Sequence, residues 1–410
     1  MTRPELFIMA YACEPGKGSE PGVGWNWAFV LSKYSNVTVM TRANNRANIE
    51  AAIGELRGHL PKFEYYDLPR WIMGLKRGSR GLYWYYVLWQ IGAYFSAKRL
   101  FRSRDFSHVL QLTFGSIWLP QFAHRLGGKF IWGPLGGGER VPNGFARTLS
   151  KRAQFSHVLR FILIKSLRFN PFIIAPLAGA EKVLLRTHDS LSIIPHKYRA
   201  KCSVELETGV NQRLLDKFKP CRNSRKNTRP VVLYVGRLVG FKNVDTLLNA
   251  AKMAQDQGSS FDLRLVGDGP EREGLEKSAK DLDLQNVTFV GNVTQSQVIQ
   301  ELKSADIFAF PSLREAGTWS LIEAMASGCP AICIDTSGMS DIADKESAIM
   351  IRPTTPAQVT KDFASALVTL CADPKLRAAL GENARTRIRS KFLWENKGRD
   401  IARQIFAERA

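Results

Sequence analysis

Short apolar segments alternate with longer amphipathic segments through the second half of the chain. Five runs of four or five mostly apolar residues are expected to be strands, at residues 231–235, 263–266, 287–290, 307–310 and 331–334. Helical patterns fill the intervals between them, at residues 243–257, in a charged stretch ending at 281, and at residues 296–304 and 319–327. This alternation predicts a parallel sheet covered by helices on both faces.

The first half repeats the alternation more loosely, with strands expected at residues 6–10, 37–40, 63–66, 109–112 and 130–132. Residues 218–230 are rich in Lys, Arg, Asn and Pro, the composition of an exposed linker. We therefore predict an α/β chain of two Rossmann-like, doubly wound domains that face each other across a cleft. Their expected bounds are residues 1–205, completed by a C-terminal helix at about 393–410, and residues 206–392. Ligands of such sheets bind at the carboxyl ends of the strands.

Two glutamates follow the strand at 307–310 with seven residues between them. Glu315 lies in the turn and Glu323 inside the next helix, and the small residues Ala316, Gly317 and Thr318 come directly after Glu315. Small residues at a helix N-terminus let backbone N–H groups approach a diphosphate closely, while the carboxylates can accept hydrogen bonds from sugar and ribose hydroxyls. Taken alone, the pair is better explained as a helix-start acid and a solvated glutamate.

A second turn changes that balance. Gly236, Arg237 and Lys242 follow the strand at 231–235, so both cations are expected at the same edge of the sheet as Glu315. A departing nucleoside diphosphate needs positive charge on its phosphate oxygens, and two fixed cations supply it. As isolated residues, Arg237 and Lys242 would more often be surface charges.

The first half has its own glycine-rich turns after strands. Residues 16–25 (GKGSEPGVGW) contain Glu20, Gly22 and Gly24, and residues 132–139 contain Gly136 and Gly137. Such glycines would let a loop approach donor phosphates and an acceptor from across the cleft. The first turn is neither a Walker A loop nor a full G-x-G-x-x-G, so by itself it is weak evidence.

These elements together resemble glycosyltransferase family 4, the retaining enzymes with the GT-B fold. The resemblance rests on the turn at 236–243, on residues 266–270 (VGDGP) and 289–293 (FVGNV), on Pro311-Ser312, and on the paired glutamates followed by residues 324–328 (AMASG). It implies that Arg237 and Lys242 bind the diphosphate, Glu315 the donor sugar and Glu323 the ribose. It further places Val290 and Val293 near the base. It makes the first-domain turns an acceptor-side element, with Gly22 and Gly24 against the donor and Glu20, Gly136 and Gly137 toward the acceptor.

The chain departs from the family pattern in two places. Ala316 and Gly317 stand where a glycine and then an aromatic residue are common, which puts the shape of the sugar pocket in doubt. The Gly133–Gly138 turn stands where many members place an active-site histidine. His188, which follows a strand at 183–185, is a substitute on the acceptor side, or it is an ordinary surface histidine.

The net charge of +21 is concentrated in the first half. Residues 1–200 hold 28 Lys and Arg against 11 Asp and Glu, a balance of +17 that leaves +4 for residues 201–410. Such an excess predicts a polyanionic partner, either anionic lipid or nucleic acid. No nucleic-acid-binding signature accompanies the charge, so lipid is the better interpretation and nucleic acid is not expected as a partner.

Two aromatic or apolar stretches with basic flanks support that interpretation. Residues 82–95 are flanked by Lys76, Arg77, Arg80, Lys98, Arg99 and Arg102, and residues 155–167 are interleaved with Lys151, Arg152, Arg160, Lys165 and Arg168. Amphipathic helices of this kind suit an anionic bilayer, but helices packed on the domain core would show the same pattern. The first stretch favours neither explanation, and the second favours the membrane.

The remaining composition narrows the setting. Six scattered cysteines form no C-x-x-C pair, so no metal site and no cofactor are expected. The sequence contains no run of 18 apolar residues, so no membrane-spanning helix is expected. We therefore expect a cytoplasmic enzyme, peripheral on the inner face of the plasma membrane. It would transfer a sugar from a UDP- or GDP-linked donor to a glycan or lipid-linked acceptor. The alternative is a non-catalytic nucleotide-sugar-binding or basic peripheral membrane protein of the same fold.

Overall fold

The computed structural model describes residues 3–73, 81–146, 151–218 and 229–406, which group into two compact units. The first unit comprises Met1–Gly138, Leu163–Glu207 and Trp394–Ala410, and the second comprises Glu139–Ile162 and Thr208–Leu393. Residues 139–162, which the sequence-based bounds put in the first domain, thus group with the second unit.

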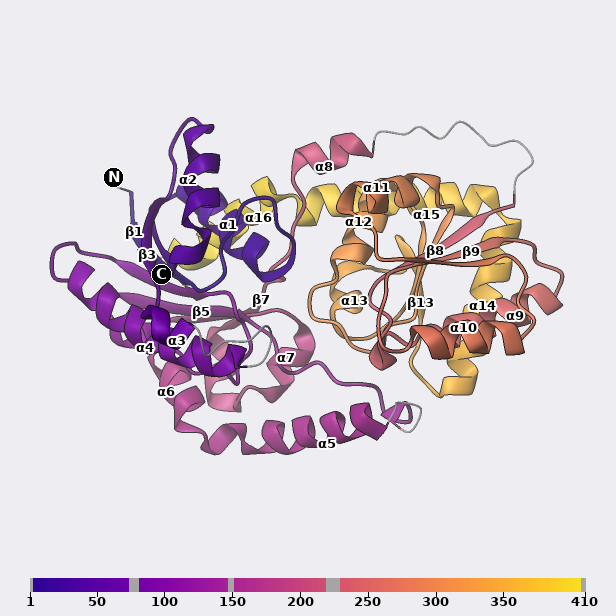
Figure 1. Cartoon of the computed structure of the whole chain (residues 1–410), viewed down its shortest axis with the longest axis horizontal. Coiled ribbons are helices and arrows are strands. Elements are labelled where there is room, and N and C mark those ends of the chain that lie inside the picture. The colour runs from indigo at the N-terminus through magenta and orange to yellow at the C-terminus, as the bar shows by residue number, and fades with distance from the viewer. Residues whose placement is uncertain (1–2, 74–80, 147–150, 219–228, 407–410) are drawn as a thin grey trace. The chain divides into compact units, whose positions relative to one another are not determined.

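The first unit is built on a parallel sheet of seven strands in the order β3-β2-β1-β4-β5-β6-β7 (Figure 1). The strands are β1 (Glu5–Ala10), β2 (Asn36–Arg42), β3 (Lys62–Tyr66), β4 (His108–Leu112), β5 (Lys129–Leu135), β6 (Lys182–Leu185) and β7 (Cys202–Val204). The helices are α1 (Ser19–Ser32), α2 (Arg46–Gly54), α3 (Arg70–Met73), α4 (Leu82–Leu100), α6 (Pro171–Gly179), α7 (His188–Ile193) and α16 (Trp394–Phe406). α5 (Lys151–Ser166) has residues in both units.

Alternate residues of β1 explain why helices cover both faces of this sheet. Phe7 and Met9 belong to a core shared with α4 and α6, whereas Leu6, Ile8 and Ala10 belong to one shared with α1 and α16. A strand buried on both faces needs an unbroken apolar run, which is what the sequence provides.

The last helix is held to the first unit by specific contacts. Lys397 of α16 forms an ion pair with Glu205, and Lys182 Nζ donates to the Gln404 carbonyl at 3.1 Å. A Cβ added to Gly398 would lie 2.7 Å from Val30 Cβ, so glycine there allows α16 to pack closely on α1.

The second unit has a parallel sheet of six strands in the order β10-β9-β8-β11-β12-β13. The strands are β8 (Val231–Val235), β9 (Asp262–Val266), β10 (Val287–Gly291), β11 (Ile307–Phe310), β12 (Ala331–Ile334) and β13 (Ala348–Ile351). The helices are α8 (Gln212–Lys217), α9 (Val244–Asp256), α10 (Arg272–Asp281), α11 (Gln295–Ser304), α12 (Trp319–Ser327), α13 (Ser337–Ile342), α14 (Pro356–Ala372) and α15 (Pro374–Arg387). The α/β prediction of two doubly wound parallel sheets is confirmed.

No helix among the described residues is long and apolar enough to cross a bilayer.

Candidate functional site

The strand order of the second unit locates a ligand-binding edge. From β8 the chain runs outward through β9 to β10, and it then returns to the other side of β8 to form β11, β12 and β13. The carboxyl ends of β8 and β11 therefore flank the topological switch point, where open α/β sheets bind ligands. The turn after β8 carries Arg237 and Lys242, and the turn after β11 carries Glu315.

Lys242 and Glu315 are brought together at this edge. Their side chains form an ion pair, and both are 13% exposed. Ser312 Oγ donates to Glu315 Oε1 at 2.8 Å, and Lys242 Nζ lies 4.8 Å from the centroid of the Phe310 ring. These contacts fix a half-buried cation beside a half-buried carboxylate. Arg237 is exposed and pairs with no carboxylate among the described residues.

Two helix N-termini at the same edge leave polar groups unpartnered. Asn243, in the left-handed conformation with φ of +55°, precedes α9; its Oδ1 accepts from Thr246 Oγ1 at 3.0 Å, while its buried Nδ2 has no partner among the described residues. Thr318 precedes α12, is 3% exposed, and its Oγ1 also has no partner there. Unpaired donors beside free backbone N–H groups of a first helical turn suit an anion such as a diphosphate.

Ala316 and Gly317 lie in the loop between Glu315 and Thr318. Gly338 N donates to the Glu315 carbonyl at 2.9 Å, and a Cβ on Gly338 would lie 2.1 Å from the Ala316 carbonyl oxygen. Close packing of α13 therefore fixes this loop from behind, a support that the sequence did not predict.

The second glutamate of the pair is buried. Glu323 is 7% exposed within α12, and burial raises the pKa of its carboxyl to about 7, an effect that a hydrogen bond from Gln295 partly opposes. Gln295 Nε2 donates to Glu323 Oε1 at 2.6 Å. Because Gln295 follows the turn that contains Val290 and Val293, this bond links the end of β10 to α12. Sequence reasoning missed both Gln295 and Asn243.

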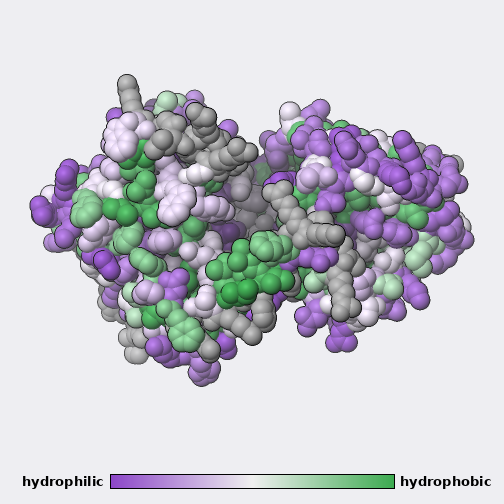
Figure 2. Space-filling model, turned by 60° about the horizontal axis from the view of Figure 1, so that its bottom comes forward, coloured by the Kyte–Doolittle hydropathy of each residue, from purple (hydrophilic) through white to green (hydrophobic). Residues whose placement is uncertain are grey.

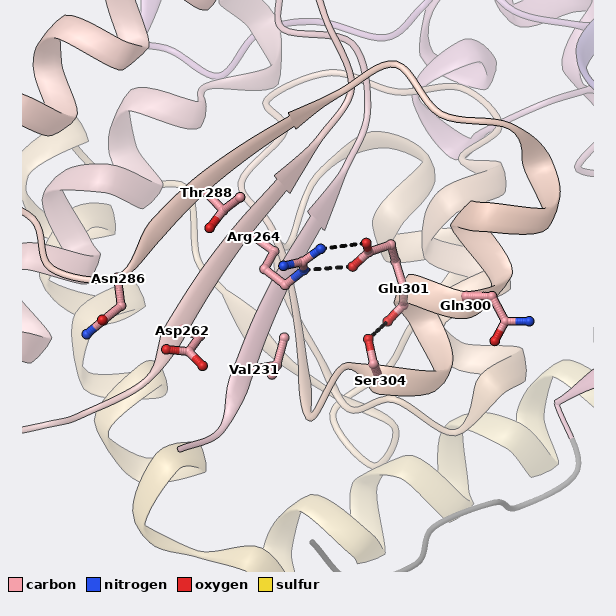
Figure 3. Close-up of a pocket in the computed structure, with 8 residues that line it drawn as sticks. All are labelled: Val231, Asp262, Arg264, Asn286, Thr288, Gln300, Glu301 and Ser304. Carbon is pink, nitrogen blue, oxygen red and sulfur yellow. Dashed lines mark hydrogen bonds and ion pairs between the residues drawn. The ribbon is translucent and has the colours of Figure 1, made fainter. Parts of the chain in front are cut away.

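A hollow of about 690 Å³ lies at the opposite edge of this sheet (Figure 3). It is lined at the amino ends of β8, β9 and β10 by Val231, Asp262, Arg264, Asn286, Thr288, Gln300, Glu301 and Ser304. Figure 3 shows Arg264 and Glu301 turned toward each other, and their two hydrogen bonds of 2.7 and 2.8 Å neutralise both charges. No predicted site residue lines this hollow, so the carboxyl edge remains the candidate site.

The corresponding switch point of the first unit lies between β1 and β4, and three charged side chains there are engaged with one another. Glu20 Oε1 pairs with Arg186 at 2.6 Å, and Glu20 Oε2 accepts from the Phe114 N–H at 2.7 Å. Arg186 Nε lies 3.2 Å from Glu207 Oε2. This network ties α1 to the ends of β4, β6 and β7, so Glu20 has a structural task besides its predicted acceptor-side role.

The first-domain glycines are explained by packing. Gly22 and Gly24 lie inside α1 rather than in a loop, and a Cβ on either would lie 2.1 Å from a carbonyl oxygen of the preceding segment. Gly136 N donates to the Gly115 carbonyl at 2.6 Å, and Gly137 has φ of +139°. His188 is exposed at the start of α7. Ligand contacts of these residues stay predictions.

No group of three or more metal-ligating side chains occurs among the residues that the structure describes.

Known proteins resemble this arrangement. Residues 217–387 match the family described as Glycosyl transferases group 1. A D-inositol 3-phosphate glycosyltransferase from Corynebacterium kroppenstedtii is 32% identical to this chain in sequence. The aligned region covers 42% of this chain and 39% of that protein. A GDP-mannose-dependent monoacylated alpha-(1-6)-phosphatidylinositol monomannoside mannosyltransferase from Corynebacterium glutamicum is 28% identical. The aligned region covers 44% of this chain and 48% of that protein. The chain thus spans less than half the length of these relatives.

The similarity in fold extends over the whole chain. Sucrose-phosphate synthase from Thermosynechococcus elongatus superposes with a TM-score of 0.64 at 20% identity, covering 99% of this chain and 100% of that one. Residues 217–387 therefore match the family Glycosyl transferases group 1, and the chain has the two-domain GT-B fold.

Proposed function

We propose that the chain is a retaining glycosyltransferase that takes a sugar from a nucleoside diphosphate donor bound at the carboxyl edge of the second unit. The observation that carries this proposal is the arrangement at that switch point. The Lys242–Glu315 pair lies there beside two helix N-termini with unpartnered donor groups. A diphosphate would satisfy Asn243 Nδ2 and Thr318 Oγ1, both of which are costly to leave unpaired when buried.

Each residue then has a distinct task. Lys242, Arg237 and the first N–H groups of α9 and α12 stabilise the negative charge that develops on the departing diphosphate. Glu315 accepts hydrogen bonds from the donor sugar, and Glu323 accepts them from the ribose hydroxyls. Retention follows if the departing phosphate oxygens help to deprotonate the acceptor on the face that the diphosphate leaves. No metal ion is assigned to this chemistry.

Turnover and stereochemistry test this function. Purified protein is incubated with UDP-, GDP- and ADP-linked sugars, first alone to detect slow hydrolysis and then with glycan and lipid-linked acceptors. NMR of the first-formed product from an α-linked donor should show an α-linkage. A β product would overturn the retaining mechanism. Binding of the donor without hydrolysis or transfer would support the alternative, a non-catalytic nucleotide-sugar-binding protein.

We further propose that the acceptor is presented at an anionic membrane, on the cytoplasmic face. The exposed apolar side chains of α5 support this: Phe155, Val158, Leu159, Ile162 and Leu163 are 40–72% exposed and recur at three- or four-residue intervals along one face. Figure 2 shows a patch of hydrophobic side chains on the face that lies at the bottom of Figure 1, where α5 is. The Corynebacterium glutamicum relative is named for a phosphatidylinositol-based substrate.

The outer face of α4 has a similar stripe. Trp84, Leu88, Ile91 and Phe95 are 38–78% exposed, and the exposed residues Lys98 and Arg99 follow in the last turn. The opposite face of α4, with Tyr85, Tyr86 and Trp89, is buried in the core. One face of α4 therefore packs on the domain core, while the exposed face supports the membrane explanation of residues 82–95 as a proposal.

Arg160 of α5 contributes less positive charge to a membrane contact than the sequence suggests. Arg160 donates to Glu139 at 3.1 Å through both its Nε and Nη2 atoms, so its charge is already paired. The side chains of Lys151, Arg152, Lys165 and Arg168 lie outside the described residues, as do Lys76, Arg77 and Arg80. Insertion of the exposed apolar side chains of α5 is expected to contribute to the attachment beside the charges.

Vesicle co-sedimentation tests the membrane proposal. Phe155, Leu159 and Ile162 are changed to Ser together, and the matched control is Leu56→Ser at an exposed apolar position of the first unit. Wild type and control should bind anionic vesicles more than neutral ones, with binding weakened near 1 M salt, where the Debye length is about 3 Å. The triple variant should lose most binding. Equal binding of all three proteins would assign the stripe to another contact.

A further inference from the structure

The Glu323 carboxylate is buried with one neutral partner. It is 7% exposed in the middle of α12, among the buried residues Leu321, Ile322 and Ala324. Its Oε1 accepts from Gln295 Nε2 at 2.6 Å, and it has no other hydrogen-bond partner among the described residues. A buried carboxylate is normally paired with a cation, because removing its charge from water is costly. A group kept without such a pair is a candidate for ligand binding.

The charged residues around Glu323 do not neutralise it. Arg385 of α15 donates to the Phe218 carbonyl, and Arg387 pairs with Asp344. Among the described residues, no ion pair joins Glu323 to a side chain of the elements packed on α12. The charged side chains of those elements are Glu301 and Lys303 on α11, Asp341 on α13, Lys375, Arg377, Glu382, Arg385 and Arg387 on α15, and Arg389 and Lys391 on the turn Ile388–Phe392. The amide of Gln295 is therefore the contact that favours the ionised form.

Gln295 is held in place by its own helix start. The Thr294 N–H donates to Gln297 Oε1 at 2.8 Å, and Thr294 Oγ1 accepts from the Gln297 N–H, which together form a capping box. Gln295 is the first residue of α11 and is itself exposed, so its side chain reaches over the buried carboxylate from the surface. The turn with Val290 and Val293, expected to approach the base, ends just before it.

We propose that Gln295 is a positioning residue of the donor site. Its amide holds one oxygen of Glu323, so that the carboxylate is fixed in place and its other oxygen can accept from the ribose of the donor. This inference rests on the proposed function, because it concerns the same nucleotide. A neutral amide suits the task since a Lys or Arg in its place would pair with Glu323 and occupy both oxygens.

The first test needs no ligand. The Glu323 carboxyl is titrated by carbon NMR in protein labelled at the glutamate side-chain carboxyl, and its signal is identified by its loss in Glu323→Gln. In Gln295→Ala the titration midpoint should move upward by about one pH unit, the size expected for one hydrogen bond to a charged group. Gln300→Ala, a like change at an exposed position of the same helix, should leave the midpoint unchanged. An unmoved midpoint in Gln295→Ala would overturn the proposal.

The second test measures nucleoside diphosphate affinity in the full chain between pH 6 and 9, with UDP, GDP and ADP as probes. At pH 7, Gln295→Ala should weaken binding about three- to tenfold, because a midpoint about one pH unit higher lowers the ionised fraction of Glu323 by roughly that factor, and binding should recover toward pH 9. In a Glu323→Gln background the same change should have no further effect. An equal loss in both backgrounds would show that Gln295 acts independently of Glu323 and would overturn the positioning role. If no probe binds wild type, the proposed function and the donor-site role fail, while the titration still reports whether Gln295 controls Glu323.

Discussion

The two sheets share one topology, yet their switch points are chemically different. At the first, Glu20, Arg186 and Glu207 are engaged with one another and with the Phe114 N–H. At the second, Asn243 Nδ2 and Thr318 Oγ1 are buried without a partner among the described residues. Buried groups that lack a partner each cost about 1–3 kcal/mol. Buried polar side chains without a partner among the described residues occur at both edges, since the Tyr11 hydroxyl and the Gln111 amide lack one at the first. The second edge differs in having such groups at two helix N-termini beside Lys242, which suits an anionic ligand.

The largest expected effect is on the stability of the fold, at the switch point of the first unit. Arg186→Met would leave the buried Glu207 and the half-buried Glu20 without their cation, and breaking such a pair costs about 3–5 kcal/mol. The control Arg104→Met removes an exposed pair with Glu64 and should cost under about 1 kcal/mol. Urea unfolding of both variants measures the difference. Equal costs would mean that the network is not the structural support described here.

The next effect is on turnover, at the other edge. Lys242→Ala or Arg237→Ala should each lower kcat by about 10²–10³, the usual loss for one preorganised charge-stabilising group. Lys252→Ala removes an exposed lysine that pairs with Asp256 and should leave kcat near that of wild type. Steady-state kinetics on folded variants measures this. Near-normal kcat in both test variants would remove Arg237 and Lys242 from the site.

Replacing Glu323 by Gln is expected to raise the stability of the fold. For Glu323, the folded pKa of about 7 lies above the ordinary 4.5, so ionisation destabilises the fold as pH rises from about 4.5 to 7. Glu323→Gln avoids that cost and should be more stable than wild type by about 3 kcal/mol above pH 7, but not below pH 4.5. The same variant should bind the donor less well while the pH profile of kcat keeps its shape. Unfolding free energies against pH test the first part, and a lost limb in the kcat profile would make Glu323 a general acid or base.

The smallest effect separates two threonines that each precede a helix. The Thr187 side chain accepts from the Ser190 N–H in the first unit, so Thr187→Val should cost about 0.5–2 kcal/mol of stability. Thr318→Val removes a hydroxyl that has no partner among the described residues. Stability should change little, while nucleotide affinity falls about three- to tenfold. Parallel unfolding and binding titrations measure both, and the reverse pattern would contradict the comparison.

Much of the fold could be predicted because its strands are unbroken apolar runs. The predicted runs at 231–235, 307–310 and 331–334 coincide with β8, β11 and β12. The strands β7 and β13 were not predicted, and β7 has only three residues (CSV), too few to show a periodicity. Gly22 and Gly24 were assigned to a loop because glycine normally disfavours a helix; the close approach of α1 to its preceding segment could not be deduced from spacing.

The site residues likewise fall into those that the sequence predicted and those that it did not. Residues in the turns after β8 and β11 could be found, because parallel strands bring their carboxyl ends to one edge. Gln295, Arg186 and Glu207 could not, since each acts through a partner 21 to 166 residues away along the chain. Asn243 could have been recognised from its local sequence, because an asparagine at the start of a predicted helix often adopts the left-handed conformation seen here.

Hydrogen–deuterium exchange of the full chain, with and without the nucleoside diphosphate that binds, locates the nucleotide site. The strongest protection is expected in peptides covering residues 236–246 and 315–323, at the carboxyl ends of β8 and β11. Strongest protection instead at the amino ends, in peptides covering residues 229–232, 262–264 and 286–288 beside the hollow of Figure 3, would contradict it.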